Sequence, residues 1–484
     1  MTNYYVSAIG ADSNPGTQTK PWKKCPGMTG WTGKGKIVPG DVIYFKNTDV
    51  WTGTVANYGT FLEVLAGVTY HGKTWGAQGA KATITGACTG DAGDLVTLYV
   101  DHPTIPTVFD GFKLTPNKNA TGLSFDWGLS SRMTNQVGAV KRIQNCLVDG
   151  IGQTSPGANC YGFNISPYDG KTVKNVEIID NIVKNCQRDG IYLYPGNESL
   201  PDLVSDVIVR GNECYLNGRS STSTGSGIKL KNHVLRALVE YNYVHDNYGG
   251  GIAFDSAPGV AVGPEDCTIR YNLVMNGKSM SNKWNSAFSF ASDNGNMSLS
   301  AWIYGNIFWS PAFENGILLT SDIGNMPISL KIYNNIIQGG NGPAFLNTSN
   351  NINAMIDLSN NILLANLGQN VFYDEHNIVT THKSNIYWRA DGGNLVVINN
   401  GQTTYKASNL ADWETTAFST NPNFKNANIL PTGFLANPWR PNTDGLAILS
   451  GNAIGHGTNL GSPYDGSINS ILRGTVWDIG AYET

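Results

Sequence analysis

Two lysines and a few aspartates are the side chains of this sequence whose types and spacing best suit chemistry. Lys229 and Lys231 alternate in the segment GSGIKLK, Asp189 precedes a glycine in RDGIYLY, and Asp255 follows an apolar stretch in GGIAFDS. A lysine that has lost its proton can act as a base, and a pair of carboxylates can act as acid and base on a glycosidic bond. These segments therefore hold the residues for two kinds of bond cleavage.

The candidate residues belong to a repeat that runs through the middle of the chain. In each unit a β-prone run leads into an asparagine, two apolar residues and a turn follow, and a second alternating strand comes next. Such alternation indicates strands with one buried face, and a period of about 25–35 residues is typical of a solenoid. The shared asparagines are Asn145, Asn181, Asn212, Asn242, Asn272, Asn306, Asn335, Asn361 and Asn385.

The repeat predicts an all-β fold, a single-stranded parallel β-helix whose asparagines stack as a ladder at the ~4.8 Å strand spacing. Each side-chain amide would satisfy backbone groups of the turns. We expect residues 1–105 to form N-terminal strands and a cap entering the solenoid, 106–395 its central coils, and 396–484 a C-terminal capping segment. All three belong to one structural domain in this prediction.

The composition narrows the classes of function. Charged residues make up 14% of the 484 residues and glycine contributes 57, which argues against a helical bundle. The formal net charge of −4 provides no basic footprint for nucleic acid, and no apolar run reaches the ~18 residues of a membrane span. We therefore expect neither nucleic acid nor a membrane as partner. An acidic substrate would have to be held by local groups or by a cation.

The second strands of the repeat can be aligned on their inward residues. The inward position of successive coils is taken by Ile191, Ile228, Ile252, Phe288 and Ile317. Because side chains alternate between the two faces of a strand, the first and third residues after these point outward. Lys229 and Lys231 hold the two outward positions on one coil, and Asp255 holds the third position on the next. The strand geometry then places Lys229 and Asp255 roughly 8 Å apart.

Several stretches outside the repeat resemble those of a known superfamily. The opening YYVSAIGADSNPGTQTKPW, the segment PGDVIYF and the closing DIGAYE resemble parts of secreted β-helix lyases and glycosidases. Nearly the whole chain is therefore similar to right-handed parallel β-helix proteins of the pectate-lyase-like superfamily. The resemblance implies a right-handed β-helix that acts on a polysaccharide.

One local match within that superfamily is sharper. Asp189 and Lys229, which are 40 residues apart, resemble a carboxylate-bearing strand and a lysine-bearing strand of polysaccharide lyase family nine. The resemblance implies that the lysine is the catalytic base. That family uses a cluster of aspartates to hold calcium, whereas Arg188 and Tyr192 stand at two of the corresponding positions here.

The lyase interpretation is β-elimination on a uronate-containing glycan. Lys229 would be the base and must be neutral to take the proton next to the substrate carboxylate. The neighbouring cation Lys231 disfavours a second positive charge. Asp255 would either form hydrogen bonds or serve on the acid side of the reaction. Oxygen ligands for Ca²⁺, the expected cofactor, would come from Asp189, Asp169 and Asn164.

A glycoside hydrolase is the alternative, because that chemistry needs two carboxylates flanking the bond. The candidates are Asp255, Asp293 and Asp322. Asp255 and Asp293 are expected roughly 8 Å apart, inside the ~6.5–9.5 Å range of inverting enzymes. Asp293 and Asp322 are expected near the ~5–5.5 Å spacing of retaining enzymes.

Other residues on or near these coils are candidates for binding the substrate. Aromatic faces suit the apolar faces of sugar rings, and polar side chains can bind hydroxyl groups. The substrate-binding candidates are Lys231, Tyr192, Tyr194, Asn164, His233, Tyr161 and Trp284.

A non-catalytic glycan-binding rod, such as a phage tailspike in a virion, is a third interpretation. The N-terminal segment MTNYYVSAIGADSNPG lacks the basic and apolar regions of a signal peptide, which suits such a protein. The mature part of an exported enzyme explains the same observation more simply. We therefore expect a monomeric secreted or cell-surface enzyme with a polysaccharide substrate, and a lyase rather than a hydrolase.

Overall fold

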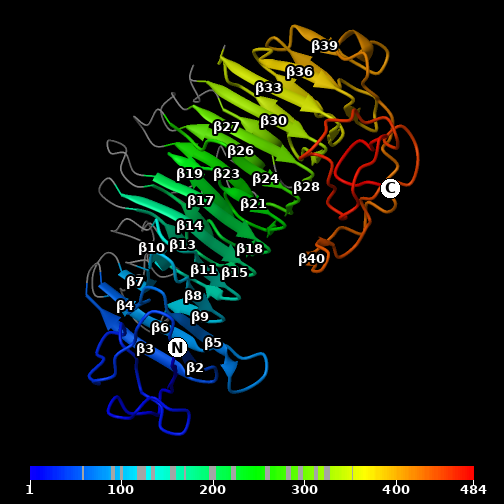
Figure 1. Ribbon diagram of the computed structural model, residues 1–484. Coiled ribbons are helices and arrows are strands. Elements are labelled where there is room, and N and C mark those ends of the chain that lie inside the picture. The colour runs from blue at the N-terminus through cyan, green and yellow to red at the C-terminus, as the bar shows by residue number, and fades with distance from the viewer. Residues whose placement is uncertain are drawn as a thin grey trace. The chain divides into compact units, whose positions relative to one another are not determined.

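The computed structural model confirms an all-β chain built from short parallel strands (Figure 1). It describes residues 1–56, 59–88, 93–98, 102–116, 127–131, 137–152, 160–167, 171–195, 203–219, 225–256, 262–278, 285–292, 298–309, 314–320, 327–351 and 353–484. The chain falls into two compact units, Met1–Gly225 (unit 1) and Ser226–Thr484 (unit 2). Over the described ranges there is no α-helix, and η2 (Leu410–Asp412) is a single short 3-10 helix. None of the described segments has the helical length and hydropathy of a membrane span.

Unit 1 contains three parallel sheets, and each coil of the chain contributes a strand to them in turn. Sheet A of unit 1 comprises β1 (Asn3–Val6), β2 (Val42–Lys46), β5 (Thr69–Trp75), β8 (Thr107–Asp110), β11 (Lys141–Gln144), β14 (Thr172–Ile179) and β17 (Leu203–Arg210). Sheet B comprises β4 (Gly59–Glu63), β7 (Gly93–Thr97), β10 (Trp127–Ser131), β13 (Tyr161–Ile165) and β16 (Ile191–Leu193). Sheet C comprises β3 (Val50–Val55), β6 (Thr83–Cys88), β9 (Lys113–Pro116), β12 (Leu147–Asp149), β15 (Ile182–Lys184) and β18 (Glu213–Tyr215).

Unit 2 repeats the same arrangement and also contains the short strand β20 (Val234–Leu235). Its sheet A comprises β21 (Leu238–Glu240), β24 (Cys267–Arg270), β27 (Leu299–Tyr304), β30 (Ile328–Tyr333), β33 (Ala354–Ser359) and β36 (Val379–Lys383). Its sheet B comprises β19 (Ile228–Lys231), β23 (Ile252–Ser256), β26 (Ser286–Ser292), β29 (Asn315–Leu319), β32 (Phe345–Asn347), β35 (Phe372–Asp374), β38 (Val396–Ile398) and the antiparallel β39 (Thr403–Tyr405). Its sheet C comprises β22 (Tyr243–His245), β25 (Leu273–Met275), β28 (Ile307–Trp309), β31 (Ile336–Gln338), β34 (Ile362–Leu364) and β37 (Ile386–Trp388).

The inward rows of sheet B in unit 2 are apolar, as the alternation predicts. Ile228, Ile252, Phe288 and Ile317 pair in register from one strand to the next, and each side chain is 0% exposed. Burying such side chains contributes ~1.5–3 kcal/mol each. The same pairing fixes the outward rows, because every second residue must face away from the core.

An asparagine ladder joins the coils of each unit. In unit 2 each amide nitrogen donates to the amide oxygen of the next asparagine at 3.0–3.1 Å. Each oxygen also accepts the backbone N–H of the preceding asparagine, as Asn306 does from Asn272 at 2.9 Å. The unit 2 ladder comprises Asn242, Asn272, Asn306, Asn335, Asn361 and Asn385. Asn181 and Asn212 form the same contact in unit 1 at 3.0 Å.

The prediction that Asn145 belongs to this ladder is wrong. The backbone N–H of Cys146, not that of Asn145, donates to the Asn181 amide oxygen at 2.9 Å. Asn145 stands one residue earlier with φ 55°, and its amide donates to Asp110 at 2.7 Å. The turn residue before a ladder position favours asparagine for its left-handed backbone, so asparagine in the sequence marks either of two adjacent positions.

The ladder of unit 2 ends on a carboxylate instead of another amide. Glu414 accepts the Asn385 backbone N–H at 2.8 Å and its side-chain amide at 3.0 Å, and it also accepts the Tyr387 hydroxyl at 2.9 Å. Glu414 is buried, and this burial raises the pKa of its carboxyl above the ordinary value, while these three donors act in the opposite direction. The carboxylate thus satisfies amide groups that would otherwise lack an acceptor at the end of the stack.

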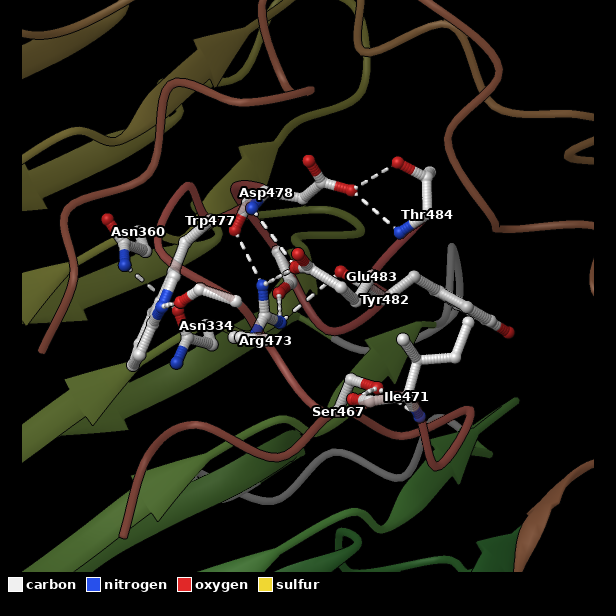
Figure 2. Close-up of polar contacts among 12 residues, drawn as sticks. Asn334, Asn360, Ser467, Ile471, Arg473, Trp477, Asp478, Tyr482, Glu483 and Thr484 are labelled. Carbon is white, nitrogen blue, oxygen red and sulfur yellow. Dashed lines mark hydrogen bonds and ion pairs between the residues drawn. The ribbon is translucent and has the colours of Figure 1, made fainter. Parts of the chain in front are cut away.

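The C-terminal segment is fastened by a buried arginine (Figure 2). Arg473 donates to Glu483 at 2.7 Å and to the backbone oxygens of Asp478 and Gly480 at 2.7 and 2.6 Å. Asn360, on a turn of unit 2, binds the Thr458 carbonyl at 2.8 Å. The closing motif DIGAYE therefore supplies partners for one cation within unit 2.

The hairpin of β40 (Phe434–Leu435) and β41 (Arg440–Pro441) belongs to the same segment. The assignment of this segment and of residues 1–105 as caps of one domain stays a prediction.

Replacing Asn306 by alanine is expected to lower the free energy of unfolding by about 3 kcal/mol, because it leaves buried backbone and amide groups on both neighbouring coils without partners. Urea unfolding followed by circular dichroism measures the loss. The exposed Asn428 offers the control, and Asn428→Ala is expected to change the value by less than about 0.5 kcal/mol. Equal stabilities for the two variants would contradict the structural role of the ladder.

Glu414→Gln is expected to change how stability depends on pH. A carboxyl with a raised pKa in the folded state contributes stability at low pH that is lost as the pH rises through the folded pKa. The amide cannot ionise, so this fall, which begins above the unfolded value of ~4.3, should be missing from the variant. Urea unfolding between about pH 4 and pH 8 tests the difference. Parallel pH curves for both proteins would contradict the assignment.

Candidate functional site

Two lysines and one aspartate meet on the outer face of sheet B in unit 2. Lys229 and Lys231 extend from β19 and Asp255 from β23, with Lys231 directly opposite Asp255 in the parallel register. The ammonium nitrogens of Lys229 and Lys231 lie 3.7 and 3.3 Å from the same carboxylate oxygen, Asp255 Oδ2. We call these three residues the lysine–aspartate cluster.

Strand alternation positions the cluster. Leu230 and Phe254, the residues between the outward positions, are 0% exposed and hold β19 and β23 against the core. Lys229 therefore lies beside Ala253 and two residues from Asp255 along the strand. The backbone spacing of roughly 8 Å predicted from this register is bridged by the long lysine side chain, which closes the nitrogen–oxygen distance to 3.7 Å.

Uncharged side chains continue both outward rows beyond the cluster. The row of Lys229 continues with Ala253, Ser289 and Leu318. The row of Lys231 and Asp255 continues with Ala291. The predicted alignment of these coils is confirmed. Uncharged residues beside the cluster leave its charged groups as the main chemical feature of these described strands.

The cluster combines two potential cations with one carboxylate in a place with little water. The side chains of Lys229, Lys231 and Asp255 are 5%, 14% and 12% exposed. Asp255 Oδ1 is buried and finds no hydrogen-bond partner among the described residues. A buried oxygen without a partner is unfavourable by ~1–3 kcal/mol. With both lysines charged the cluster has a net charge of +1, which suits an anionic ligand.

A column of tyrosines occupies the outer face of sheet B in unit 1. Tyr161 stacks on Tyr192 with 4.3 Å between ring centroids, and Tyr192 stacks on Tyr194 at 5.2 Å. The guanidinium of Arg188 lies 5.4 Å from the Tyr161 ring centroid. Burial raises the pKa of the Tyr161 hydroxyl far above its ordinary value, so this ring stays neutral. Tyr194 is the least buried ring of the three.

Two other predicted residues of unit 1, Asn164 and Asp189, are described and buried. Asn164 pairs in register with Tyr192 and is 4% exposed, and its Oδ1 has no hydrogen-bond partner within the described part of the chain. Asp189 is 1% exposed and its backbone oxygen accepts the N–H of Gly162. No group of three or more His, Cys, Asp or Glu side chains that could hold a metal ion occurs among the described residues.

Some predicted residues lie outside the described ranges. They are Asp169, Trp284, Asp293 and Asp322. The spacing predicted for the aspartate pairs therefore stays a prediction. His233, two residues after β19, is half-buried.

Two features of these sites go beyond the sequence analysis. Lys231, expected only to bind the substrate, makes a shorter contact with Asp255 than Lys229, the expected base. Arg188, treated as a departure from a calcium site, lies instead against an aromatic ring. The shorter Lys231 contact could have been found from the sequence, because Lys231 and Asp255 both hold the third outward position of their strands. Nothing in the sequence pattern distinguished the cation–π contact of Arg188 from a solvated arginine.

Comparisons with known proteins agree with this fold. A family model described as "Disaggregatase related" matches residues 173–298. The GH136 lacto-N-biosidase from Eubacterium ramulus aligns with a TM-score of 0.54 and 14% identity over 79% of this chain. The chain spans 66% of the length of that protein. XylC in complex with xylose aligns with a TM-score of 0.51 and 10% identity, over 99% of this chain and 98% of that one.

The likeness is one of fold. The predicted similarity to parallel β-helix proteins is thereby confirmed at the level of architecture. Pectate lyase Pel9A aligns with a TM-score of 0.42 and 16% identity over 100% of this chain and 96% of that one. No curated protein sequence matches this chain. At such identities the choice of reaction must come from the side chains of this chain.

Replacing Asp255 by asparagine is expected to lower the free energy of unfolding by about 2–3 kcal/mol, because removing one partner of a buried ion pair leaves the other charge uncompensated. Adding Lys231→Met to this variant should restore part of the loss. The exposed Asp412 provides the control, and Asp412→Asn should behave as the unchanged protein. Urea unfolding measures all four proteins. An Asp255→Asn variant as stable as the parent would contradict the ion pairing.

Proposed function

We propose that this protein is a carbohydrate-active enzyme that cleaves a uronate-containing polysaccharide by β-elimination. The observation that carries the proposal is the lysine–aspartate cluster, in which a nearly buried lysine lies beside a second lysine and a carboxylate on the outer face of the β-helix. β-Elimination requires a base and a cation at the substrate carboxylate, and the two lysines of the cluster could fill these two roles.

Lys229 is the base in this mechanism. Its neutral amine takes the proton from the carbon next to the uronate carboxylate, and the electron pair of that C–H bond forms the new carbon–carbon double bond. The bond to the glycosidic oxygen breaks at the same time or next, and the leaving oxygen takes up a proton. Because only an uncharged amine can take up the proton, cleavage should increase with pH.

Unit 1 has its own proposed sugar-binding surface, the ring of Tyr194. The Tyr194 ring stacks on Tyr192 and is the least buried of the three tyrosines. An aromatic face suits the apolar face of a sugar. Asn164, Asp189 and Asp169 remain the proposed oxygen ligands of a calcium ion. No step of the reaction proposed for Lys229 depends on that ion.

The activities and ligands named for the structural neighbours support a carbohydrate substrate. They include a lacto-N-biosidase and a protein in complex with xylose. A polysaccharide substrate in turn places the proposed action outside the cell or at its surface. Of the proposed chemistries, only elimination uses both lysines of the cluster.

Glycoside hydrolysis is the second candidate, and one observation favours it. Asp255 Oδ1 has no hydrogen-bond partner among the described residues, as expected of a carboxylate oxygen kept for a substrate. Asp255 would then act as acid or base, with Asp293 or Asp322 as the second carboxylate. This reaction yields reducing ends without a double bond, which separates it from elimination.

Lys229→Ala is expected to reduce the rate of cleavage of an acidic polysaccharide by at least about 100-fold, the usual contribution of a positioned base. The assay follows absorbance near ~235 nm, where the unsaturated product absorbs, and reducing ends in parallel. The panel consists of polygalacturonate, alginate and chondroitin sulfate. Lys331→Ala, which removes an exposed lysine from β30, should retain the parent rate.

Three results would overturn parts of this proposal. Reducing ends without absorbance would replace elimination by hydrolysis. Full activity of Lys229→Ala would remove that lysine from the mechanism. Binding of the polymers with no product of either kind would make the protein a glycan-binding rod.

A further inference from the structure

We propose that Lys231 is the group that recognises the substrate carboxylate, so that the protein selects polysaccharides whose uronates carry a free acid rather than an ester or amide. This inference rests on the proposed function, because it concerns the same cluster. It assigns the two lysines different roles: Lys229 removes the proton and Lys231 binds the negative charge.

The spacing of the two ammonium groups suits this division. They lie 3.7 and 3.3 Å from one oxygen of Asp255, so their nitrogens are at most about 7 Å apart. In a uronate the carbon that loses its proton is bonded directly to the carboxylate carbon. A base touching that hydrogen and a cation touching the carboxylate, each at a contact of ~3 Å, must lie within a similar distance of one another. The pair can therefore address one sugar unit.

Exposure and distance decide which lysine takes which role. The Lys231 side chain is 14% exposed against 5% for Lys229, and a charged form is tolerated better where water remains. The Lys231 nitrogen also lies closer to Asp255 Oδ2, at 3.3 Å, than the Lys229 nitrogen does, at 3.7 Å. Asp255 thus forms the closer ion pair with Lys231.

The reaction itself explains why a cation is needed at this place. As the proton leaves, negative charge moves onto the substrate carboxylate, and a cation already in position stabilises the transition state without reorganisation. An esterified carboxyl carries no charge before the reaction and so gains less from Lys231 in binding. Selectivity for the free acid follows from the same contact that assists the chemistry.

The role of Lys231 can be tested by comparing binding to one polymer in two charge states. The full chain carrying Lys229→Ala is titrated calorimetrically with polygalacturonate and with its methyl ester, and each of the other acidic polymers of the panel is treated in the same way. Adding Lys231→Met is expected to weaken binding of the free acid at least tenfold and to leave binding of the ester within about twofold. Lys231→Arg, which keeps the charge, should recover most of the affinity, and Lys331→Met serves as the matched control.

Turnover separates this inference from the proposed reaction. In the protein with Lys229 intact, Lys231→Met should raise KM for the free acid about tenfold and reduce the preference for the acid over the ester.

A parent protein that binds no acidic polymer, or a Lys231→Met variant that distinguishes acid from ester as well as the parent does, overturns the role of Lys231. If products show hydrolysis while the loss of preference persists, the lyase reaction fails and the carboxylate recognition stands. If Lys231→Met does not fold, Lys231→Gln and Lys231→Arg provide the same comparison.

Discussion

Parallel stacking of coils in a fixed register is the constraint on which the rest of this structure depends. Strands ~4.8 Å apart turn each position of the repeat into a row of side chains, and the asparagine ladder holds that register in the turns. A slip of one residue would exchange the inner and outer rows. The buried rows of isoleucine and phenylalanine would then face water, and Lys229 would face the core.

The register explains how a chain with few charged residues builds a charged cluster. Lys229 and Lys231 come from one strand and Asp255 from the next, and only pairing of Lys231 with Asp255 brings them to a common oxygen. Most neighbouring outward positions on these strands are small or uncharged. The electrostatics of the outer face in this part of unit 2 are therefore dominated by three side chains. These three side chains are the ones that we propose to act on the substrate.

Much of the fold could be predicted from the sequence, because alternation and the repeated asparagine are local signals. The inward alignment of Ile228, Ile252 and Phe288 and the ladder from Asn242 onward agree with the structure. The pattern could not tell Asn145 from Cys146, because a left-handed turn residue and a ladder residue are adjacent and both favour asparagine. It also could not foresee Glu414 as the end of the ladder, since a single carboxylate outside the repeat has no periodic signal.

The candidate site was predicted less completely, for a physical reason. Strand register gives the spacing of the backbones. It does not give the position of the Lys229 nitrogen, because a lysine side chain has four torsion angles and the attraction of the Asp255 carboxylate helps to set them. The most direct test of the account is a crystal structure of Lys229→Ala with a bound acidic oligosaccharide. The account predicts a uronate carboxylate within hydrogen-bond distance of Lys231, with the adjacent carbon facing the place that the Lys229 amine would occupy. A sugar chain bound away from the lysine–aspartate cluster would contradict it.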